Sequence, residues 1–149
     1  MTAMSPHDEP YAVLLPQDAA WRVSSMMKIP NANLADGLGS ERLGARLWRL
    51  PPYSANTWHR HVEQDEIYFV LEGTGRLRVG GDTVTIPKYG AVLVRPACLR
   101  QVFNDTDREV LWLILGAPRH EHVADRSTIY PEDPLQLPVE LHGRTWPPK

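Results

Sequence analysis

Short runs of β-branched, aromatic and other apolar residues recur through the middle of the chain, and turn-forming residues separate them. Residues 66–72 are one such run. Gly73-Thr74-Gly75 and Gly80-Gly81-Asp82 are expected to be tight turns, because glycine can adopt the positive φ of a hairpin. Many short strands with frequent turn signals are typical of an all-β sandwich or barrel. We expect strands near residues 44–50, 56–61, 66–72, 75–80, 82–86, 91–95, 99–104 and 109–115.

The segments on either side of this region have a different character. Residues 34–42 are the only helix candidate, and two glycines within them oppose a helix. From Pro118 onward, prolines interrupt any periodicity, although apolar side chains such as Leu137 and Trp146 remain. We expect this arm to pack on the barrel or on a partner subunit. The chain is therefore divided into an N-terminal arm with edge strands (1–43), a barrel core (44–117) and a Pro-rich C-terminal arm (118–149).

Composition and charge argue against several classes of protein. The 149 residues have the length of one domain, and the formal net charge is −2 with acidic and basic residues intermixed. Nothing in this pattern indicates binding to nucleic acid or to an anionic membrane surface. No apolar run approaches the ~18 residues of a membrane span. The first ten residues lack the features of a signal peptide, and Cys98 is the only cysteine, so we expect a cytoplasmic protein.

The segment Thr57–Gly73, TWHRHVEQDEIYFVLEG, contains the candidate chemistry. His59 and His61 are separated by one residue, so their imidazoles point to the same face of an extended strand. Glu66 follows after a short gap, and Tyr68 shares its face as a candidate proton donor. Two imidazoles and a carboxylate that converge on one point are suitable ligands for a divalent ion of iron, manganese, nickel or zinc.

This pattern resembles the first motif of the cupin family, in which Gly, five residues, His-x-His, three or four residues, Glu, six residues and Gly follow one another. His59, His61, Glu66 and Gly73 are in register with the motif, and only the leading Gly is absent, with Tyr53 in its place. The resemblance extends over roughly residues 43–117. It implies a jelly-roll barrel, also called a double-stranded β-helix, with a mononuclear metal site.

The second cupin motif ends in a third histidine and an asparagine, and the segment Gly90–Asn104 resembles it only in outline. Counting from Gly90 places Gln101 at the histidine position, whereas counting back from Asn104 places Arg100 there. These two residues occupy opposite faces of one strand, so only one of them faces the cavity. An inward Gln101 is a weak fourth metal ligand. An inward Arg100 cannot bind metal, because guanidinium has no acceptor, and pairs instead with Glu66 or with an anionic substrate, or replaces the charge of the metal.

Other candidate residues surround this region. Arg100, Trp58 and Asn104 are candidates for the ligand pocket. A second His-x-His, His120-Glu121-His122, follows the last expected strand and is interpreted as a solvated tail rather than a second site.

Three classes of function remain open, and one of them is a purely structural or partner-binding role based on the long C-terminal arm and the expected dimer. The first is an enzyme, a small metal cupin that acts on a small organic acid or aromatic compound as an oxygenase, isomerase or lyase. The alternative is a non-catalytic cupin that binds a small molecule and whose metal site is degenerate because the third histidine is replaced. The expected partners are a small-molecule ligand and a second copy of the chain, because the resemblance also implies a homodimer.

Overall fold

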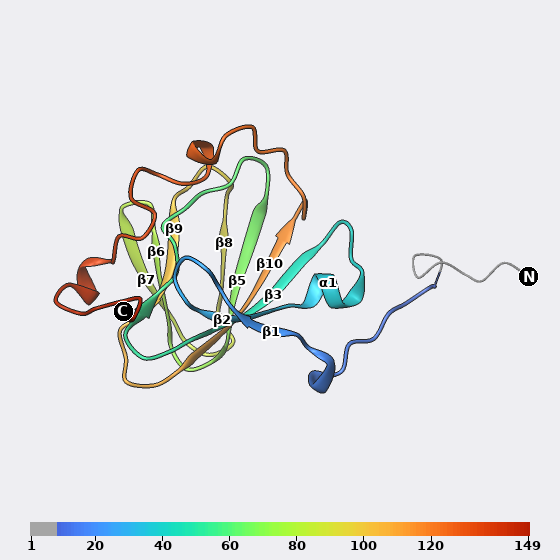
Figure 1. Cartoon of the computed structure of the whole chain (residues 1–149), viewed down its shortest axis with the longest axis horizontal. Helices are drawn as coiled ribbons and strands as arrows, with labels where there is room; N and C mark the ends of the chain where they lie inside the picture. The colour runs from blue at the N-terminus through green and yellow to red at the C-terminus, as the bar shows by residue number, and fades with distance from the viewer. Residues whose placement is uncertain (1–8) are drawn as a thin grey trace, which may run out of the picture.

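The chain folds into two antiparallel β-sheets, as shown by a computed structural model that describes residues 9–149 (Figure 1). In spatial order, the six-stranded sheet contains β1 (Trp21–Val23), β2 (Pro30–Asn33), β3 (Gly44–Leu50), β10 (Val110–Ala117), β5 (Asp65–Glu72) and β8 (Ala91–Val94). The four-stranded sheet contains β4 (Ser54–Ala55), β9 (Arg100–Asn104), β6 (Gly75–Val79) and β7 (Asp82–Ile86). The described residues also form α1 (Leu34–Leu38) and the short 3₁₀ helices η2 (Pro16–Asp18), η3 (Arg126–Thr128) and η4 (Val139–Leu141).

This architecture confirms the all-β barrel expected from the sequence. Seven of the eight expected strands are present, with ends shifted by two residues at most. The expected helix at residues 34–42 is shorter than predicted, because Gly39 adopts a left-handed conformation with φ of 66° and ends α1 after Leu38. At its other end, the side chain of Asn33 accepts a hydrogen bond from the backbone N–H of Asp36.

The strand expected at residues 56–61 is wrong. Regular pairing with β9 covers only Ser54–Ala55. Beyond it, the segment is joined to β9 by the backbone N–H of Asn56, which donates to the carbonyl of Val102, and by an isolated bridge at His59. Two backbone N–H groups on the other side of the segment point to the C-terminal arm: Trp58 donates to the carbonyl of Pro134 at 2.9 Å, and Arg60 donates to another carbonyl of that arm. The arm therefore takes the place of a neighbouring strand.

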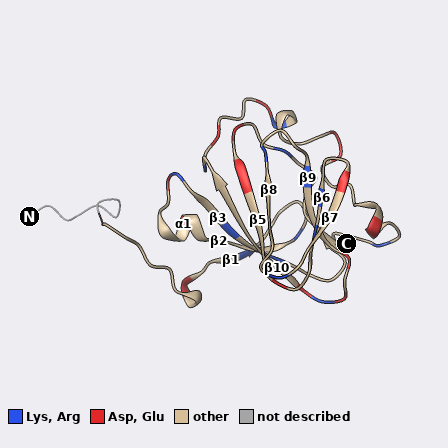
Figure 2. Ribbon diagram, turned by 180° about the vertical axis from the view of Figure 1, so that it is seen from behind, with Lys and Arg blue, Asp and Glu red and all other residues tan. Residues whose placement is uncertain are grey.

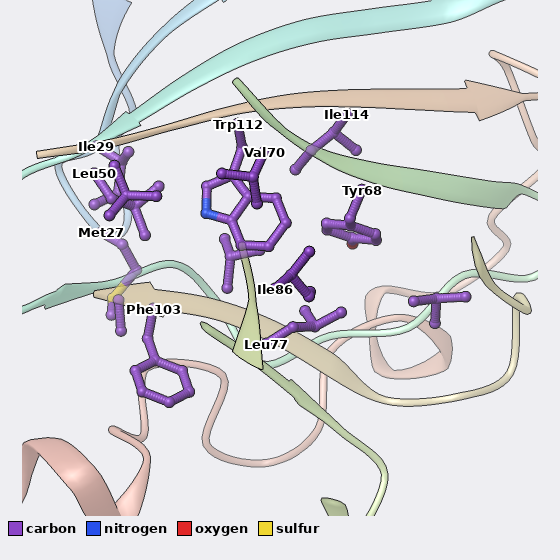
Figure 3. Packing of buried hydrophobic residues seen from close by; sticks show 14 of the residues in the cluster. Met27, Ile29, Leu50, Tyr68, Val70, Leu77, Ile86, Phe103, Trp112 and Ile114 are labelled. Carbon is purple, nitrogen blue, oxygen red and sulfur yellow. The ribbon is translucent and has the colours of Figure 1, made fainter. Parts of the chain in front are cut away.

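The hydrophobic core lies between the two sheets. Along β5, Glu66, Tyr68 and Val70 are buried, and the residues that alternate with them are more exposed. Trp112 of β10 is fully buried beside Val70 (Figure 3). Its close packing requires Gly75, because a Cβ at that position would lie 2.4 Å from the Trp112 ring. A buried tryptophan of this kind contributes roughly 4–6 kcal/mol of transfer free energy.

The C-terminal arm packs on the barrel. Leu141 is fully buried, and Leu137 and Trp146 pack against the core cluster. The indole N–H of Trp146 donates to the backbone carbonyl of Met27 at 2.7 Å. The arm is thus tied both to the core and to the segment between β1 and β2.

The N-terminal segment leaves the barrel at β1 and projects away from it (Figure 1). Tyr11, Val13 and Leu15 are exposed, whereas Leu14 lies against Gly37 of α1. Residues 1–8 of the expected arm are outside the described range.

Charged residues of both signs are scattered over the strands and their connections (Figure 2). Within residues 9–149, no helix has the length and apolar character that crossing a bilayer requires.

Candidate metal centre

A cavity of about 560 Å³ lies on the inner face of the six-stranded sheet. Two rows of residues form its floor across β5, β10 and β3: Glu66, Gly116 and Gly44, and then Tyr68, Ile114 and Arg46. The two glycines of the first row carry no side chain, and the side-chain amide of Gln64 lies over Gly116 in the space that a Cβ would fill. The volume is that of a small-molecule site.

His59, His61 and Glu66 meet in this cavity, as their spacing in the sequence predicts. Their ligand atoms all lie within 4.8 Å of one another. Oε1 of Glu66 is 3.1 Å from Nε2 of His61 and 4.0 Å from Nε2 of His59. Metal bonds of ~2.0–2.2 Å place adjacent ligand atoms ~3 Å apart in an octahedron and slightly farther apart in a tetrahedron. The three residues are therefore positioned to bind a divalent metal ion.

The backbone fixes the ring of His59. Its Nδ1 lies 3.1 Å from the carbonyl oxygen of Thr57, which can only accept, so Nδ1 carries the hydrogen and Nε2 keeps its lone pair. Burial lowers the pKa of His59 to about 4, with the nearby His61 and Arg100 adding to this effect and Glu66 opposing it. The imidazole is consequently neutral near pH 7, which is the form that binds metal.

His61 lies between two carboxylates. Its Nδ1 is 2.7 Å from Oε1 of Glu121 and donates a hydrogen bond to it. Its Nε2 faces Glu66 and is a buried atom without a hydrogen-bond partner. Burial lowers the pKa of His61, but the two carboxylates outweigh burial and raise it. A cation between Nε2 and Glu66 would satisfy both groups, so the residues present fit a metal ion.

Glu121 belongs to the C-terminal arm and is anchored by the loop that follows His61. Its Oε2 accepts hydrogen bonds from the backbone N–H groups of Val62, Glu63 and Gln64 at 3.0, 2.6 and 3.0 Å. Burial raises the pKa of Glu121, but these hydrogen bonds and that from His61 outweigh it and lower the pKa to about 2. A carboxylate in this place fixes the tautomer and the orientation of a metal-binding histidine.

Tyr68 and Arg100 hold Glu66 from the other side. The Tyr68 hydroxyl donates to Oε1 of Glu66 at 2.7 Å, and Nε of Arg100 lies 3.9 Å from the same oxygen. Burial raises the pKa of Glu66, but His61, His59 and Tyr68 outweigh it and lower the pKa. Burial and the charge of Glu66 raise the pKa of Tyr68 well above its usual value of 10. Tyr68 therefore stays protonated and can donate a hydrogen.

Arg100, rather than Gln101, faces Glu66. Arg100 is fully buried, and its guanidinium donates to three backbone carbonyls in the turn 94–96 at 2.7 to 3.5 Å. Gln101 points to the opposite face of β9, where its Nε2 donates to two backbone carbonyls, one of them that of Gln136 in the C-terminal arm at 2.8 Å. The structure does not bring the Gln101 amide to the metal cluster, because side chains alternate along a strand.

Two expected pocket residues lie outside the cavity lining. The Trp58 ring packs under the guanidinium of Arg78, 3.8 Å from its centroid. Nδ2 of Asn104 donates to three backbone carbonyls, and its Oδ1 accepts from Thr106, so Asn104 fixes the turn after β9. Among the expected catalytic and pocket residues, only Tyr68 lines the cavity; Arg100 lies behind Glu66.

Sequence reasoning missed two residues of the site, Glu121 and Arg46. The interpretation of residues 120–122 as a solvated tail is wrong for Glu121, whose side chain is only 9% exposed. No strand periodicity reaches Glu121, so the sequence held no signal for its position. Arg46 did leave a signal, because it shares one face of the expected strand with Gly44 and Trp48, and all three line the cavity.

Together, these features define the class of protein: a β-barrel with a candidate mononuclear metal centre at a small-molecule cavity. Residues 46–116 match the family model of the cupin domain, and the protein is a cupin-domain protein. No functionally curated protein matches the sequence.

Many solved structures share the fold. A sugar phosphate isomerase of the cupin superfamily from Silicibacter pomeroyi is 24% identical, with a TM-score of 0.64 over 70% of this chain and 74% of that one. KdgF from a Halomonas species is 17% identical, with a TM-score of 0.62 over 71% of this chain and 94% of that one. A predicted oxalate decarboxylase from Thermotoga maritima is 19% identical, with a TM-score of 0.63 over 71% and 98%. At these identities, the likeness establishes the fold alone.

Proposed function

We propose that the protein is a metal-dependent enzyme that converts a small organic acid by isomerase- or lyase-type chemistry. One observation carries this proposal: His59, His61 and Glu66 direct their ligand atoms to one point of a cavity large enough for a small substrate. A bound divalent ion would supply Lewis-acid polarisation of a substrate oxygen.

The surrounding residues supply orientation and a proton. Glu121 and the Thr57 carbonyl keep the Nε2 lone pairs of both histidines directed at the metal position. Tyr68 orients Glu66 and lines the cavity, and its hydroxyl stays protonated, which makes Tyr68 the proposed proton donor. Arg100 neutralises part of the charge of Glu66 from behind.

The names of the fold neighbours are compatible with small acidic substrates. They include sugar phosphate isomerases and a predicted oxalate decarboxylase. These names support the class of substrate and do not select a reaction.

The alternative is a cupin that binds a small molecule without turnover. Arg100 favours it, because it is an inward residue at the expected place of the third histidine and brings a positive charge to 3.9 Å from Glu66. Three protein ligands then remain for a metal ion, and the guanidinium opposes its charge.

The test is elemental analysis of protein purified without chelator, followed by turnover. We expect a metal-to-chain ratio near one in wild type and near zero in the double variant His59→Ala/His61→Ala. The exposed pair His122→Ala/His142→Ala serves as the matched control and should retain the metal. A ratio near zero in wild type after incubation with iron, manganese, nickel and zinc would refute the metal centre. Metal-loaded protein that binds organic acids but never converts them would establish the alternative.

We also propose that the protein is a homodimer. Leu93, Ile67 and Leu115 are 49, 42 and 38% exposed, and they pair in one row across the outer face of the six-stranded sheet. The projecting N-terminal segment offers further exposed apolar side chains, so a second copy supplies a complementary surface. Light scattering should give twice the 16.9 kDa of one chain, and Ile67→Glu should shift the mass towards the monomer.

The absence of a disulfide partner for Cys98 supports a cytoplasmic location.

A further inference from the structure

We propose that Arg46 forms an oxyanion-binding subsite in the cavity, at a distance from the metal cluster. The substrate would then be a small molecule with a carboxylate or phosphate at one end and a metal-binding oxygen at the other. The inference rests on the proposed function in one respect, because it takes this anion to be the far end of the molecule on which the metal centre acts.

The register of the sheet sets the distance between the two ends. Arg46 of β3 pairs with Ile114 of β10, which pairs with Tyr68 of β5. With strands ~4.8 Å apart, the backbones of Arg46 and Tyr68 are separated by ~10 Å. The floor between them is made by the apolar side chain of Ile114, and the amide of Gln64 lies over the neighbouring Gly116. A molecule of a few carbon atoms that lies on this floor reaches from the metal cluster to the guanidinium.

Neighbouring side chains fix the guanidinium and leave part of it available. Asn31 is 1% exposed, and its Nδ2 donates to the backbone carbonyls of Arg22 and Ile29, so its Oδ1 faces Arg46. Nη1 of Arg46 donates to that oxygen at 2.7 Å, and Cζ lies 5.5 Å from the centroid of the Trp48 ring. This is the only hydrogen bond of the guanidinium within residues 9–149, and an arginine has five N–H donors. A preorganised fork of this kind suits the planar or tetrahedral oxygens of a carboxylate or phosphate.

The charge of Arg46 is not compensated. No carboxylate of the described residues forms an ion pair with it, whereas Arg119, the other arginine of the cavity lining, is paired with Asp36. Burial lowers the pKa of Arg46, and the positive charge of Arg22 adds to this effect. A partly desolvated cation without a counter-charge is unfavourable, and an oxyanion relieves it. Arg100, by contrast, donates its guanidinium hydrogens to backbone carbonyls of residues 94–96.

A structural role is the competing explanation for Arg46. In that case, the guanidinium only ties β3 to β2 through Asn31, and its replacement lowers the melting temperature without changing the affinity for anions. The two explanations therefore differ in a binding measurement.

The experiment is calorimetric titration of the full-length, metal-free protein with malonate and, separately, with inorganic phosphate. The variants are Arg46→Gln and Arg46→Lys. The matched control is Arg49→Gln, which removes the same charge from the same strand, but from a side chain outside the cavity that pairs with Glu109. Metal content is determined for every variant, and circular dichroism verifies that each is folded.

We expect malonate, phosphate or both to bind wild type and Arg49→Gln equally, and Arg46→Gln roughly 10- to 100-fold more weakly, as the loss of hydrogen bonds to a charged group implies. Arg46→Lys keeps the positive charge but lacks the planar guanidinium, so its affinity for the anion should lie between those of wild type and Arg46→Gln. If Arg46→Gln does not fold, the affinity of Arg46→Lys tests the inference. The probe that depends on Arg46 distinguishes carboxylate from phosphate recognition.

Two results would overturn the inference: equal anion affinity in wild type and Arg46→Gln, or no binding of either probe to wild type. The proposed function fails separately. If wild type binds no metal but its anion binding depends on Arg46, the anion subsite is supported and the proposed metal-dependent reaction is refuted.

Discussion

Replacement of Glu121 by Gln is the sharpest probe of the metal centre, because it changes one atom of a side chain that does not itself bind the metal. In the native protein, Oε1 accepts the Nδ1 hydrogen of His61 and Oε2 accepts three backbone hydrogens. A glutamine can keep its single oxygen on the three backbone groups. Its NH₂ then faces Nδ1 of His61, and two donors oppose each other.

His61 can relieve this opposition only by moving its hydrogen to Nε2. That nitrogen faces Glu66 at 3.1 Å, where the metal would bind, so the favoured tautomer of the variant has a hydrogen in the metal position. Binding must restore the other tautomer and lose a hydrogen bond to a charged group, which is worth about 1.5–3 kcal/mol. This corresponds to a decrease in affinity of roughly 10- to 100-fold, the range found when outer partners of metal-binding histidines are changed.

The affinities of wild type and Glu121→Gln for Mn²⁺ and Zn²⁺ can be measured by competition with a chromophoric chelator of known affinity. Glu63→Gln is the matched control, since it removes an equal charge from an exposed side chain in the same loop. We expect the control to bind like wild type. If Glu121→Gln kept the wild-type affinity, Glu121 would have no positioning role. If Glu63→Gln fell as far as Glu121→Gln, the effect would be one of net charge and the tautomer argument would be refuted.

Two further predictions concern stability. Gly75→Ala should lower the free energy of unfolding by about 1–3 kcal/mol, because the new Cβ would meet the Trp112 ring. Gly81→Ala is the control and should have little effect, because nothing lies within 4 Å of its new Cβ. Equal melting temperatures in the two variants would contradict this explanation by packing. For pH, the pKa of Glu121 is lowered from 4.5 to about 2 on folding, so its contribution to stability is present above pH 4.5 and is lost as the pH falls towards 2. Denaturant unfolding of the metal-free protein should show wild type losing stability faster than Glu121→Gln over this interval, and a difference between them that does not change with pH would contradict the shift.

The fold was largely predictable because its signals are local. Alternating side chains and glycine turns placed β3 and β5 to β10 within two residues of their ends. The error at residues 56–61 has a physical cause, since the sequence of a segment indicates its strand propensity but not the chain with which it pairs. Here one of the two neighbours of the segment is the C-terminal arm, which has no periodic pattern of its own.

The residues of the candidate metal centre also differ in whether a local sequence signal predicts them. His59, His61 and Glu66 are close in sequence, and local spacing was sufficient to bring them together. Glu121 is 60 residues from His61, and only the folded chain reveals their contact. The choice between Arg100 and Gln101 depended on which face of β9 is inward, and two motif counts that differed by one residue gave opposite answers.

The C-terminal arm also has a consequence for the order of biosynthesis. The ribosome releases the chain from the N-terminus, so residues 46–116 of the cupin domain emerge before Glu121 and Pro134. At that stage, His61 lacks the carboxylate that orients it, and Trp58 lacks its backbone acceptor. The full affinity for a metal ion is therefore expected only after the C-terminal arm has emerged and Glu121 contacts His61.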